Sequence, residues 1–176
     1  MCTINIKEAI MQRHSVRTFL SKKITRTQIN ELIELGILAP SGSNIQSWRF
    51  IVVDDAMLIN SIISISPGIN GMPPCIIVLC SDKELAYRKG GIMGRDEMSV
   101  IDVSLAAENI MLAAVGMGLG SCLIKSFSDK LVAMLLNLPP NIYPEMMITL
   151  GYSANECKRP IRKSIDEVLS YNKWGA

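Results

Sequence analysis

Residues 13–17 bring together groups that suit the binding of an anion. They read Arg-His-Ser-Val-Arg, so two guanidinium groups flank a hydroxyl at the end of a predicted helix. Guanidinium donates paired hydrogen bonds to anionic or planar oxygens, and its charge is permanent. The segment therefore suits a dianionic phosphate and the polar edge of an aromatic ring system. Taken singly, each arginine would more commonly be a solvated charge at a helix end.

A second segment, residues 40–47, is a loop of small and polar residues that reads Pro-Ser-Gly-Ser-Asn-Ile-Gln-Ser. Gly42 permits a positive φ, and Ser41, Asn44 and Gln46 can direct short polar groups at a planar ligand. The same composition is also that of an ordinary turn. The loop is therefore a candidate ligand site only in combination with the first segment.

The sequence gives less support to other catalytic or metal sites. His14 is the single histidine, which excludes a metal site of several histidines, and no Gly-x-Ser-x-Gly motif is present. His14 either lends a backbone amide or neutral ring to a ligand, or is simply packed. The five cysteines include no Cys-x-x-Cys pair, so we expect reduced thiols and no iron–sulfur or zinc site. We expect Cys75 and Cys80 to be buried small hydrophobes, and Cys122 to pack rather than react.

Length and composition predict one domain with a substantial core, because 49% of the 176 residues are hydrophobic. The net charge of +2 and the aromatic content of 5% argue against a general binder of polyanions or nucleic acid. The N-terminus lacks the pattern of a signal peptide. The longest uncharged apolar stretch, residues 109–124, is broken by glycines and is shorter than the ~20 residues of a spanning helix. We therefore expect a soluble, cytoplasmic protein.

The hydrophobic pattern predicts a scaffold of alternating helices and buried strands. Thr25 and Gln28 form a capping box for one helix, and an earlier helix, capped by Asn5 or Thr3, ends just before Arg13. The predicted helices cover residues 5–12, 25–38, 57–65, 100–115 and 128–137, and the predicted strands cover residues 48–53, 75–80, 121–124 and 146–150.

Two stretches bear on the surfaces of this scaffold. Residues 81–98 are polar and mixed, which we interpret as a mobile stretch that could cover a substrate pocket. Apolar residues almost surround the predicted helix 100–115, which in so short a chain indicates a subunit interface. Trp48 is expected in the core at the start of a strand. The elements together predict an α+β or mixed three-layer domain.

The two segments, in their order along the chain, resemble the nitroreductase family of flavoproteins, enzymes that bind FMN at a dimer interface. Residues 39–48 are similar to the family's Ala-Pro-Ser-x-x-Asn-x-Gln-Pro-Trp loop, with Ser47 in place of proline. Residues 116–125 look like the family's Gly-Leu-Gly turn, and residues 150–154 resemble its Gly-Tyr-Pro turn, with Ser153 in place of proline. The resemblance implies an α+β, three-layer fold in which helices flank a central mixed, mainly antiparallel sheet, built as an intertwined homodimer with exchanged termini.

The same resemblance implies roles for individual residues. Arg13 and Ser15 would hold the phosphate and ribityl oxygens of FMN, and Arg17 would approach the N1/C2 edge of the flavin. The loop would reach the flavin of the partner subunit, and a backbone amide at Ile124 or Lys125 could donate to flavin N5. The implied cofactor-binding residues are Arg13, His14, Ser15, Arg17, Pro40, Ser41, Gly42, Asn44, Gln46, Ile124, Lys125, Arg162 and Lys163.

We therefore predict an FMN-dependent oxidoreductase that takes a hydride from NADH or NADPH and passes electrons to a small electron-poor acceptor such as a nitroaromatic or a quinone. No side chain is expected to act as a nucleophile or strong base, because flavin N5 carries the hydride. Two alternatives remain open. One is another flavin reaction on the same fold, either reductive dehalogenation or flavin breakdown. The other is a non-catalytic module that binds anions or nucleic acid through the basic residues 13–26 and 158–163.

Overall fold

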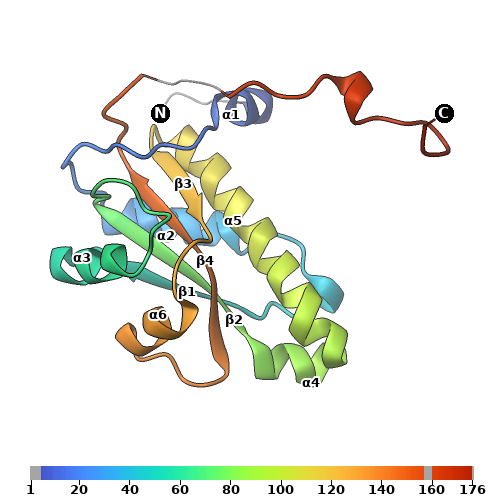
Figure 1. The fold of residues 1–176 in the computed structure, drawn as a ribbon, viewed down its shortest axis with the longest axis horizontal. Helices are drawn as coiled ribbons and strands as arrows, with labels where there is room; N and C mark the ends of the chain where they lie inside the picture. The colour runs from blue at the N-terminus through green and yellow to red at the C-terminus, as the bar shows by residue number, and fades with distance from the viewer. Residues whose placement is uncertain (1–4, 157–159, 176) are drawn as a thin grey trace.

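A computed structural model describes residues 5–156 and 160–175, and places helices on both faces of one sheet (Figure 1). A 3₁₀ turn, Gly42–Asn44, follows the second helix, and a π-helical turn, Gly94–Met98, joins the fourth helix to the fifth. The helices are α1 (Ile6–Gln12), α2 (Arg26–Gly36), α3 (Ala56–Ser64), α4 (Lys83–Met93), α5 (Ser99–Gly116) and α6 (Asp129–Leu135), and the strands are β1 (Trp48–Val53), β2 (Cys75–Asp82), β3 (Gly120–Ile124) and β4 (Ile142–Gly151).

The four strands form one sheet in the order β1-β2-β4-β3, and all three pairings are antiparallel. Along the outer side of β3, Ser15 forms an isolated parallel bridge with Ser121. The predicted α+β fold, with helices on both sides of a mainly antiparallel sheet, is confirmed, whereas the four strands of the described residues form no parallel pair and the sheet is therefore not mixed. The bridge also places the arginine-containing segment 13–17 on the sheet edge.

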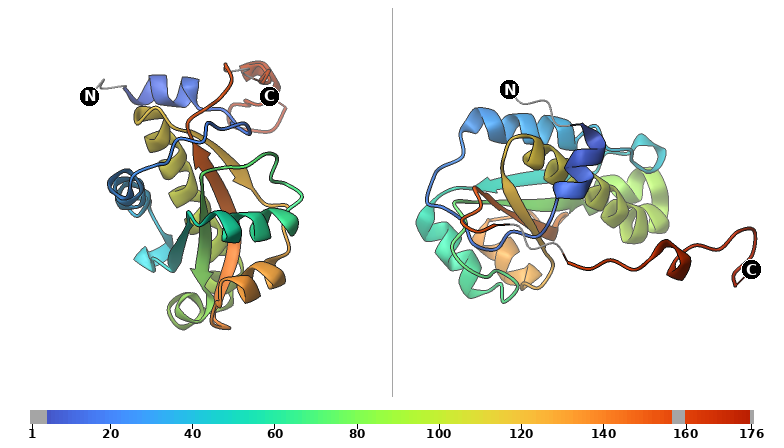
Figure 2. Two further views of the ribbon diagram at one scale, coloured as in Figure 1. Left: turned by 90° about the vertical axis from the view of Figure 1, so that its left-hand side faces the viewer. Right: turned by 90° about the horizontal axis from the view of Figure 1, so that it is seen from above.

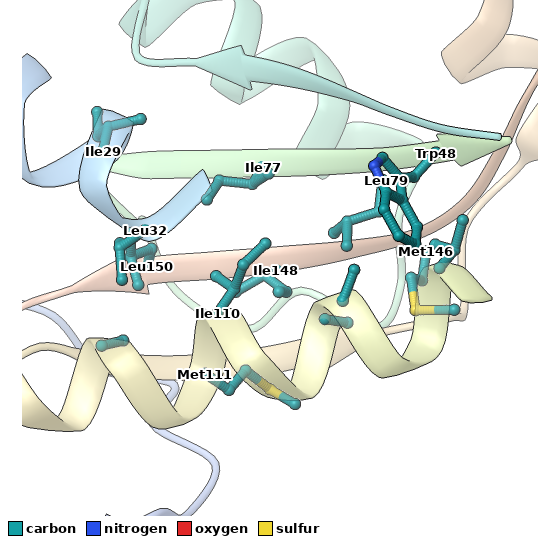
Figure 3. Packing of buried hydrophobic residues seen from close by; sticks show 14 of the residues in the cluster. Ile29, Leu32, Trp48, Ile77, Leu79, Ile110, Met111, Met146, Ile148 and Leu150 are labelled. Carbon is teal, nitrogen blue, oxygen red and sulfur yellow. The ribbon is translucent and has the colours of Figure 1, made fainter. Parts of the chain in front are cut away.

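The core has two halves, one on each face of the sheet. The central strand β2 supplies both, because successive side chains of a strand point to opposite faces. Ile77 packs with Leu32 of α2 and Ile110 of α5 on one face (Figure 3). Ile76 packs with Ile62 of α3 on the other face. All five side chains are fully buried, and this burial makes β2 apolar on both faces, as its sequence predicts.

Side-chain caps determine where the first helices begin. Asn5 Oδ1 accepts the Glu8 N–H at 2.9 Å, and a Glu8 carboxylate oxygen accepts the Asn5 N–H at 3.1 Å. Thr25 and Gln28 form the same reciprocal arrangement at α2. Each capping box satisfies two backbone donors that the helix itself leaves unpaired. The predicted caps are confirmed, and α1 ends so that Arg13 is the first residue beyond it.

Most of the polar stretch 81–98 is helical. That it is mobile and covers a substrate pocket remains a prediction. Asp82 caps α4 by accepting the Leu85 N–H at 3.0 Å. Two features make this helix hard to predict from the sequence. Its cap belongs to the preceding strand, and two adjacent glycines interrupt it, with Gly91 at a φ of 62° that kinks the backbone.

The helical run 83–116 is long and apolar enough to cross a membrane by length and composition alone. The kink at Gly91 interrupts this run, and α5 within it buries one face against α2 and the sheet. Packing therefore accounts for much of its apolar composition. The helix is not covered on every side in the single chain, because Ile101 and Leu105 of α5 are 48% and 41% exposed.

The C-terminal residues 160–175 extend away from the sheet and its helices (Figure 2). A short 3₁₀ turn, Ile165–Glu167, is the only helical turn within them. Their apolar side chains lie largely in solvent, with Ile161 99% and Trp174 94% exposed. This part of the single chain thus has apolar surface that its own core does not bury.

Candidate functional site

The segment 13–17 is held against the start of β3 by a close backbone approach. The Val16 N–H donates to the Ser121 carbonyl at 2.9 Å. A Cβ atom on Gly120 would lie 2.6 Å from Val16 Cγ2, well inside van der Waals contact, so a glycine is needed there. The alternation of the extended chain buries Val16 and leaves its neighbours Ser15 and Arg17 exposed.

Two hollows adjoin this segment and share three lining residues, His14, Val16 and Ser153. The first hollow has a volume of about 350 Å³, and its further lining comes mainly from the end of α5 and the turn before β3. The second has a volume of about 460 Å³ and is more polar. Its further lining residues are Ser15, Arg17, Thr18, Asn155 and Glu156.

The charged groups of the segment differ in how they are paired. Arg13 Nε lies 3.5 Å from a carboxylate oxygen of Glu108 on α5, so this guanidinium is tethered to the helix. Arg17 forms no ion pair within the described ranges 5–156 and 160–175. Glu156 lines the same polar hollow as Arg17 and adds a negative charge there. Arg17 is therefore the cation of this hollow that is available to a ligand.

His14 stands at the junction of the two hollows. Its Nδ1 lies 2.8 Å from the Gln12 carbonyl oxygen, so Nδ1 carries the proton that is donated in this contact. In the neutral ring this tautomer leaves Nε2 as a hydrogen-bond acceptor. His14 can thus hold a ligand hydroxyl or N–H without a change of protonation.

The loop 41–46 is built from unusual backbone conformations. Ser43, Asn44 and Gln46 have φ angles of 50°, 54° and 55°, a region that costs residues other than glycine about 1 kcal/mol or more each. Gln46 Nε2 donates to Asn44 Oδ1 at 2.9 Å, and the Gln46 N–H donates to Ser41 Oγ at 3.2 Å. The loop therefore holds its polar side chains in one arrangement, while Asn44 and Gln46 remain exposed.

The loop and the segment 13–17 lie near opposite ends of α5 (Figure 1). The Gly42 N–H donates to Asp102 Oδ1 at 2.9 Å, close to the start of the helix. Val115, near its end, lines the first hollow beside Val16. At a rise of about 1.5 Å per residue, the thirteen steps from residue 102 to residue 115 span about 20 Å. One chain does not bring the two predicted halves of the site together.

Arg13, tethered to Glu108, and four other predicted site residues lie outside both hollows. Ile124 is buried and pairs with Met147 at the far end of β3, and Lys125 Nζ donates to the Glu145 carbonyl. The hollows instead adjoin the start of β3. Arg162 and Lys163 are exposed on the C-terminal segment that extends away from the domain (Figure 2). Their proposed contacts with a cofactor remain predictions.

Sequence reasoning did not select several residues that line the hollows. Ser153 is the clearest, because it lies at the junction and also replaces the proline of the motif described above. Ser153 Oγ donates to the Asn155 carbonyl at 2.8 Å and so organises the turn that carries Asn155 and Glu156. The serine in place of the motif's proline is the sequence feature that could have identified this residue. Its side-chain hydrogen bond stabilises the turn where the motif has a proline.

The buried cysteines are packing residues. Cys75 and Cys80 lie within the sheet, and burial raises the pKa of each thiol to about 12. Cys122 is also buried, with its side chain among the residues under α3 and α6. Since the thiolate is the reactive form, Cys75 and Cys80 are inert at neutral pH.

Comparison with known proteins adds an independent line of observation. The sequence model of the nitroreductase family matches residues 10–66 and 64–152. The "Putative NADH dehydrogenase/NAD(P)H nitroreductase" of Archaeoglobus fulgidus is 31% identical over 153 residues, with 84% of each chain covered. The "FMN reductase (NADPH)" of Bacillus subtilis is 29% identical over 170 residues, covering 86% of this chain and 67% of that protein. A crystal structure of a Bacteroides thetaiotaomicron protein that bears the same name as the A. fulgidus relative superposes with a TM-score of 0.84 at 30% identity, covering 98% of this chain and 100% of that one.

Proposed function

The chain belongs to the nitroreductase family, and from this premise we propose that it is an FMN-dependent oxidoreductase that carries reducing equivalents from NADH or NADPH to a small electron-poor acceptor. The names of its relatives support each part. One is an FMN reductase that uses NADPH, and another is named as an NAD(P)H nitroreductase. Use of these nucleotides also fits the cytoplasmic location expected from the sequence.

The paired hollows are the observation that carries the proposal. FMN joins a flat, largely apolar ring to a polar chain that ends in a phosphate. One hollow is bounded by Val115, Leu119 and Gly120, and the adjoining one by Ser15 and Arg17. An apolar compartment beside a polar one that offers the Arg17 guanidinium suits a ligand of this kind. The residues present therefore fit the cofactor.

Each polar residue of the segment has a distinct task in this proposal. Arg17, which the resemblance alone would place at the N1/C2 edge of the flavin, here lies with Ser15 at the polar, phosphate-bearing end and donates charge-assisted hydrogen bonds to it. His14 Nε2 accepts a hydrogen bond where the two hollows meet. Bound FMN supplies the hydride chemistry, so no side chain has to act as a nucleophile. Glu156 also lines the polar hollow, and its carboxylate offsets part of the positive charge that Arg17 offers to the phosphate.

We propose that a homodimer completes the site. The loop 41–46 lies about 20 Å along α5 from the hollows, so a second copy must supply it to the same ligand. The exposed Ile101 and Leu105 on α5 and the extended residues 160–175 are surfaces that such a partner would cover. In this arrangement an exchanged C-terminal segment would bring Arg162 and Lys163, which the resemblance assigns to cofactor binding, to the cofactor of the other subunit.

The proposal is tested by an absorption spectrum of the purified protein with and without added FMN. NADH and NADPH are then added separately in the absence of oxygen. We expect flavin bands that bleach with at least one nucleotide, and recovery of the bands when a nitroaromatic or quinone is added. The mass in solution is measured on the same sample, and we expect twice that of one chain.

Three results would count against parts of this proposal. A protein that does not bind FMN would contradict the cofactor assignment. Bound FMN that neither nucleotide reduces would contradict the donor and favour another flavin reaction on this fold. A single-chain mass in the presence of bound FMN would contradict the shared site.

A further inference from the structure

Glu145 is a carboxylate buried inside the sheet, with 3% of its side chain exposed. The pairing of β2 with β4 shifts at this point, because Leu79 pairs with Met146 whereas Cys80 pairs with Pro144. Glu145 is therefore the extra residue of a β-bulge, a feature that redirects a side chain out of the regular pleat. Its Oε1 accepts the Ser81 hydroxyl at 2.6 Å.

Lys83 is the cation that neutralises this carboxylate. Its Nζ lies 2.5 Å from Glu145 Oε1, 2.9 Å from Ser99 Oγ and 3.0 Å from the Arg95 carbonyl oxygen. An ammonium group has three N–H donors, so all three are used. A buried ion pair adds little net stability, because its desolvation offsets much of its attraction. Its more distinctive effect here is to fix three separate elements at one point.

The elements that meet at Lys83 include the π-helical turn. The Arg95 carbonyl accepts both Lys83 Nζ and the Ser99 hydroxyl, the latter at 2.7 Å. Side-chain donors to a carbonyl within a helix compete with the regular backbone ladder and hold local departures from it. Lys83 and Ser99 therefore stabilise the wide turn Gly94–Met98 in its observed form.

This turn and the first turns of α5 are the support on which the strained loop 41–46 rests. A Cβ atom on Gly42 would lie 2.8 Å from Met98 Cε, and Asp102, 1% exposed, accepts the Gly42 N–H. A Cβ atom on Gly90 would lie 3.0 Å from Ile45 Cδ1, and Ile45 is the buried anchor of the loop. Residues in unfavourable backbone conformations persist only where their surroundings fix them.

We propose that the Lys83–Glu145 pair is a positioning device for the loop 41–46. Through the π-helical turn and Asp102, it holds Asn44 and Gln46 in the arrangement that they present to the cofactor site of a second copy. The effect on catalysis rests on the proposed function, whereas the effect on the loop does not. Lys83 and Glu145 are positioning residues, since neither lines a hollow.

Hydrogen exchange of the loop amides tests the first half of this proposal. Lys83→Met removes the charge and keeps most of the side-chain length, and we expect the Gly42 amide to exchange about tenfold faster at a temperature well below unfolding. Amides of β2 such as that of Ile77 should be unchanged. Lys89→Met, at an exposed position of the same helix, is the matched control. Unchanged exchange at Gly42 would overturn the proposal even if Lys83→Met lowers the melting temperature.

A double-mutant cycle with Asp102 tests the second half. Asp102→Ala removes the acceptor of the Gly42 N–H, whereas Asp102→Asn keeps an acceptor oxygen. If Lys83 acts through this contact, Lys83→Met should lower kcat/KM for the acceptor about tenfold in the wild type and in the Asp102→Asn variant, and about twofold or less in the Asp102→Ala variant. Equal losses in all three backgrounds would overturn the proposal.

These experiments separate the two hypotheses. If the wild-type protein binds no FMN, the proposed function fails and the exchange of Gly42 still decides the role of Lys83. If Asp102→Ala does not fold, the cycle is built instead on Glu145→Gln. The double variant Lys83→Met/Glu145→Gln should then exchange at Gly42 no more slowly than Lys83→Met alone. Protection restored to the wild-type level by that double variant would show that only the unpaired charge of Glu145 disturbs the loop, and would overturn the proposal.

Discussion

The segment 13–17 and the loop 41–46 serve one proposed site, yet they are held in opposite ways. The segment is extended, lies on the edge of β3 through the Val16–Ser121 hydrogen bond, and leaves Arg17 free among the described residues. The loop has three residues with positive φ and rests on a buried support. A long charged side chain such as that of Arg17 can reach a ligand from regular backbone. A short polar side chain such as that of Asn44 must be placed by the backbone itself.

The largest effect should come from removing the free cation of the segment. Arg17→Ala deletes a charge-assisted contact worth about 2 kcal/mol, so FMN binding should weaken about 30-fold. Lys23→Ala is the control, since Lys23 is exposed and lines neither hollow. The dissociation constant is measured from quenching of flavin fluorescence. Equal affinities of the two variants would mean that the polar hollow does not receive the phosphate.

A second comparison concerns the contact that holds the segment on the sheet. Gly120→Ala places a methyl group 2.6 Å from Val16 Cγ2, and overpacking of this kind costs about 2 kcal/mol. Gly118→Ala meets nothing within 4 Å but has a φ of 70°, which costs about 1 kcal/mol. Urea denaturation measures both free energies of unfolding. Gly120→Ala should weaken FMN binding more than Gly118→Ala does, because only Gly120→Ala displaces residues 13–17, although Gly118 also lines the first hollow.

The contrast between the two regions also predicts opposite responses to glycine. Ser43→Gly relieves a φ of 50° and should raise the free energy of unfolding by about 0.5–1 kcal/mol. Thr18→Gly, just beyond the segment, relieves no positive φ and adds freedom to the unfolded chain, so it should lower the free energy of unfolding by about 0.5–1 kcal/mol. Thermal melts of both variants measure the signs. A loss of stability in Ser43→Gly would show that the loop backbone is not strained.

Some helices and strands could be predicted from the sequence because their signals come from neighbouring residues. The pair Thr25–Gln28 specifies the start of α2 through neighbours three residues apart, and Asn5, one of the two predicted caps, begins α1. The buried strand β2 follows from its unbroken apolar run. These signals depend on nearby residues only, so they need no knowledge of the tertiary fold.

Other features depend on contacts between distant segments and could not be predicted. The place of Ile124 and Lys125, at the far end of β3 from the hollows, follows from the register of β3 against β4. The bulge at Glu145 can be recognised only from the register of β2 against β4, and the same holds for its ion pair with Lys83. The separation of the two site segments likewise follows from how α5 lies between them.

The smallest expected effect concerns Ser47, which joins the loop to β1 and replaces the proline of the family motif. Its Oγ and that of Ser66 are the two buried side-chain oxygens without a hydrogen-bond partner in the part of the chain that the structure describes. Removing an unsatisfied hydroxyl should be neutral or stabilising, by up to about 1 kcal/mol.

Ser47→Ala and Ser66→Ala should therefore raise the urea midpoint slightly and to similar extents, because each loses the same hydroxyl from a fully buried position. The first lies beside the strained loop and the second beyond α3, so the pair separates a general effect of burial from one specific to the loop. A destabilising Ser47→Ala with a neutral Ser66→Ala would mean that a water bonds the Ser47 hydroxyl in solution. That water would then help to hold the loop, in addition to the contacts with Met98 and Asp102. In that case Ser47→Ala should lower the turnover of the acceptor as well as the stability.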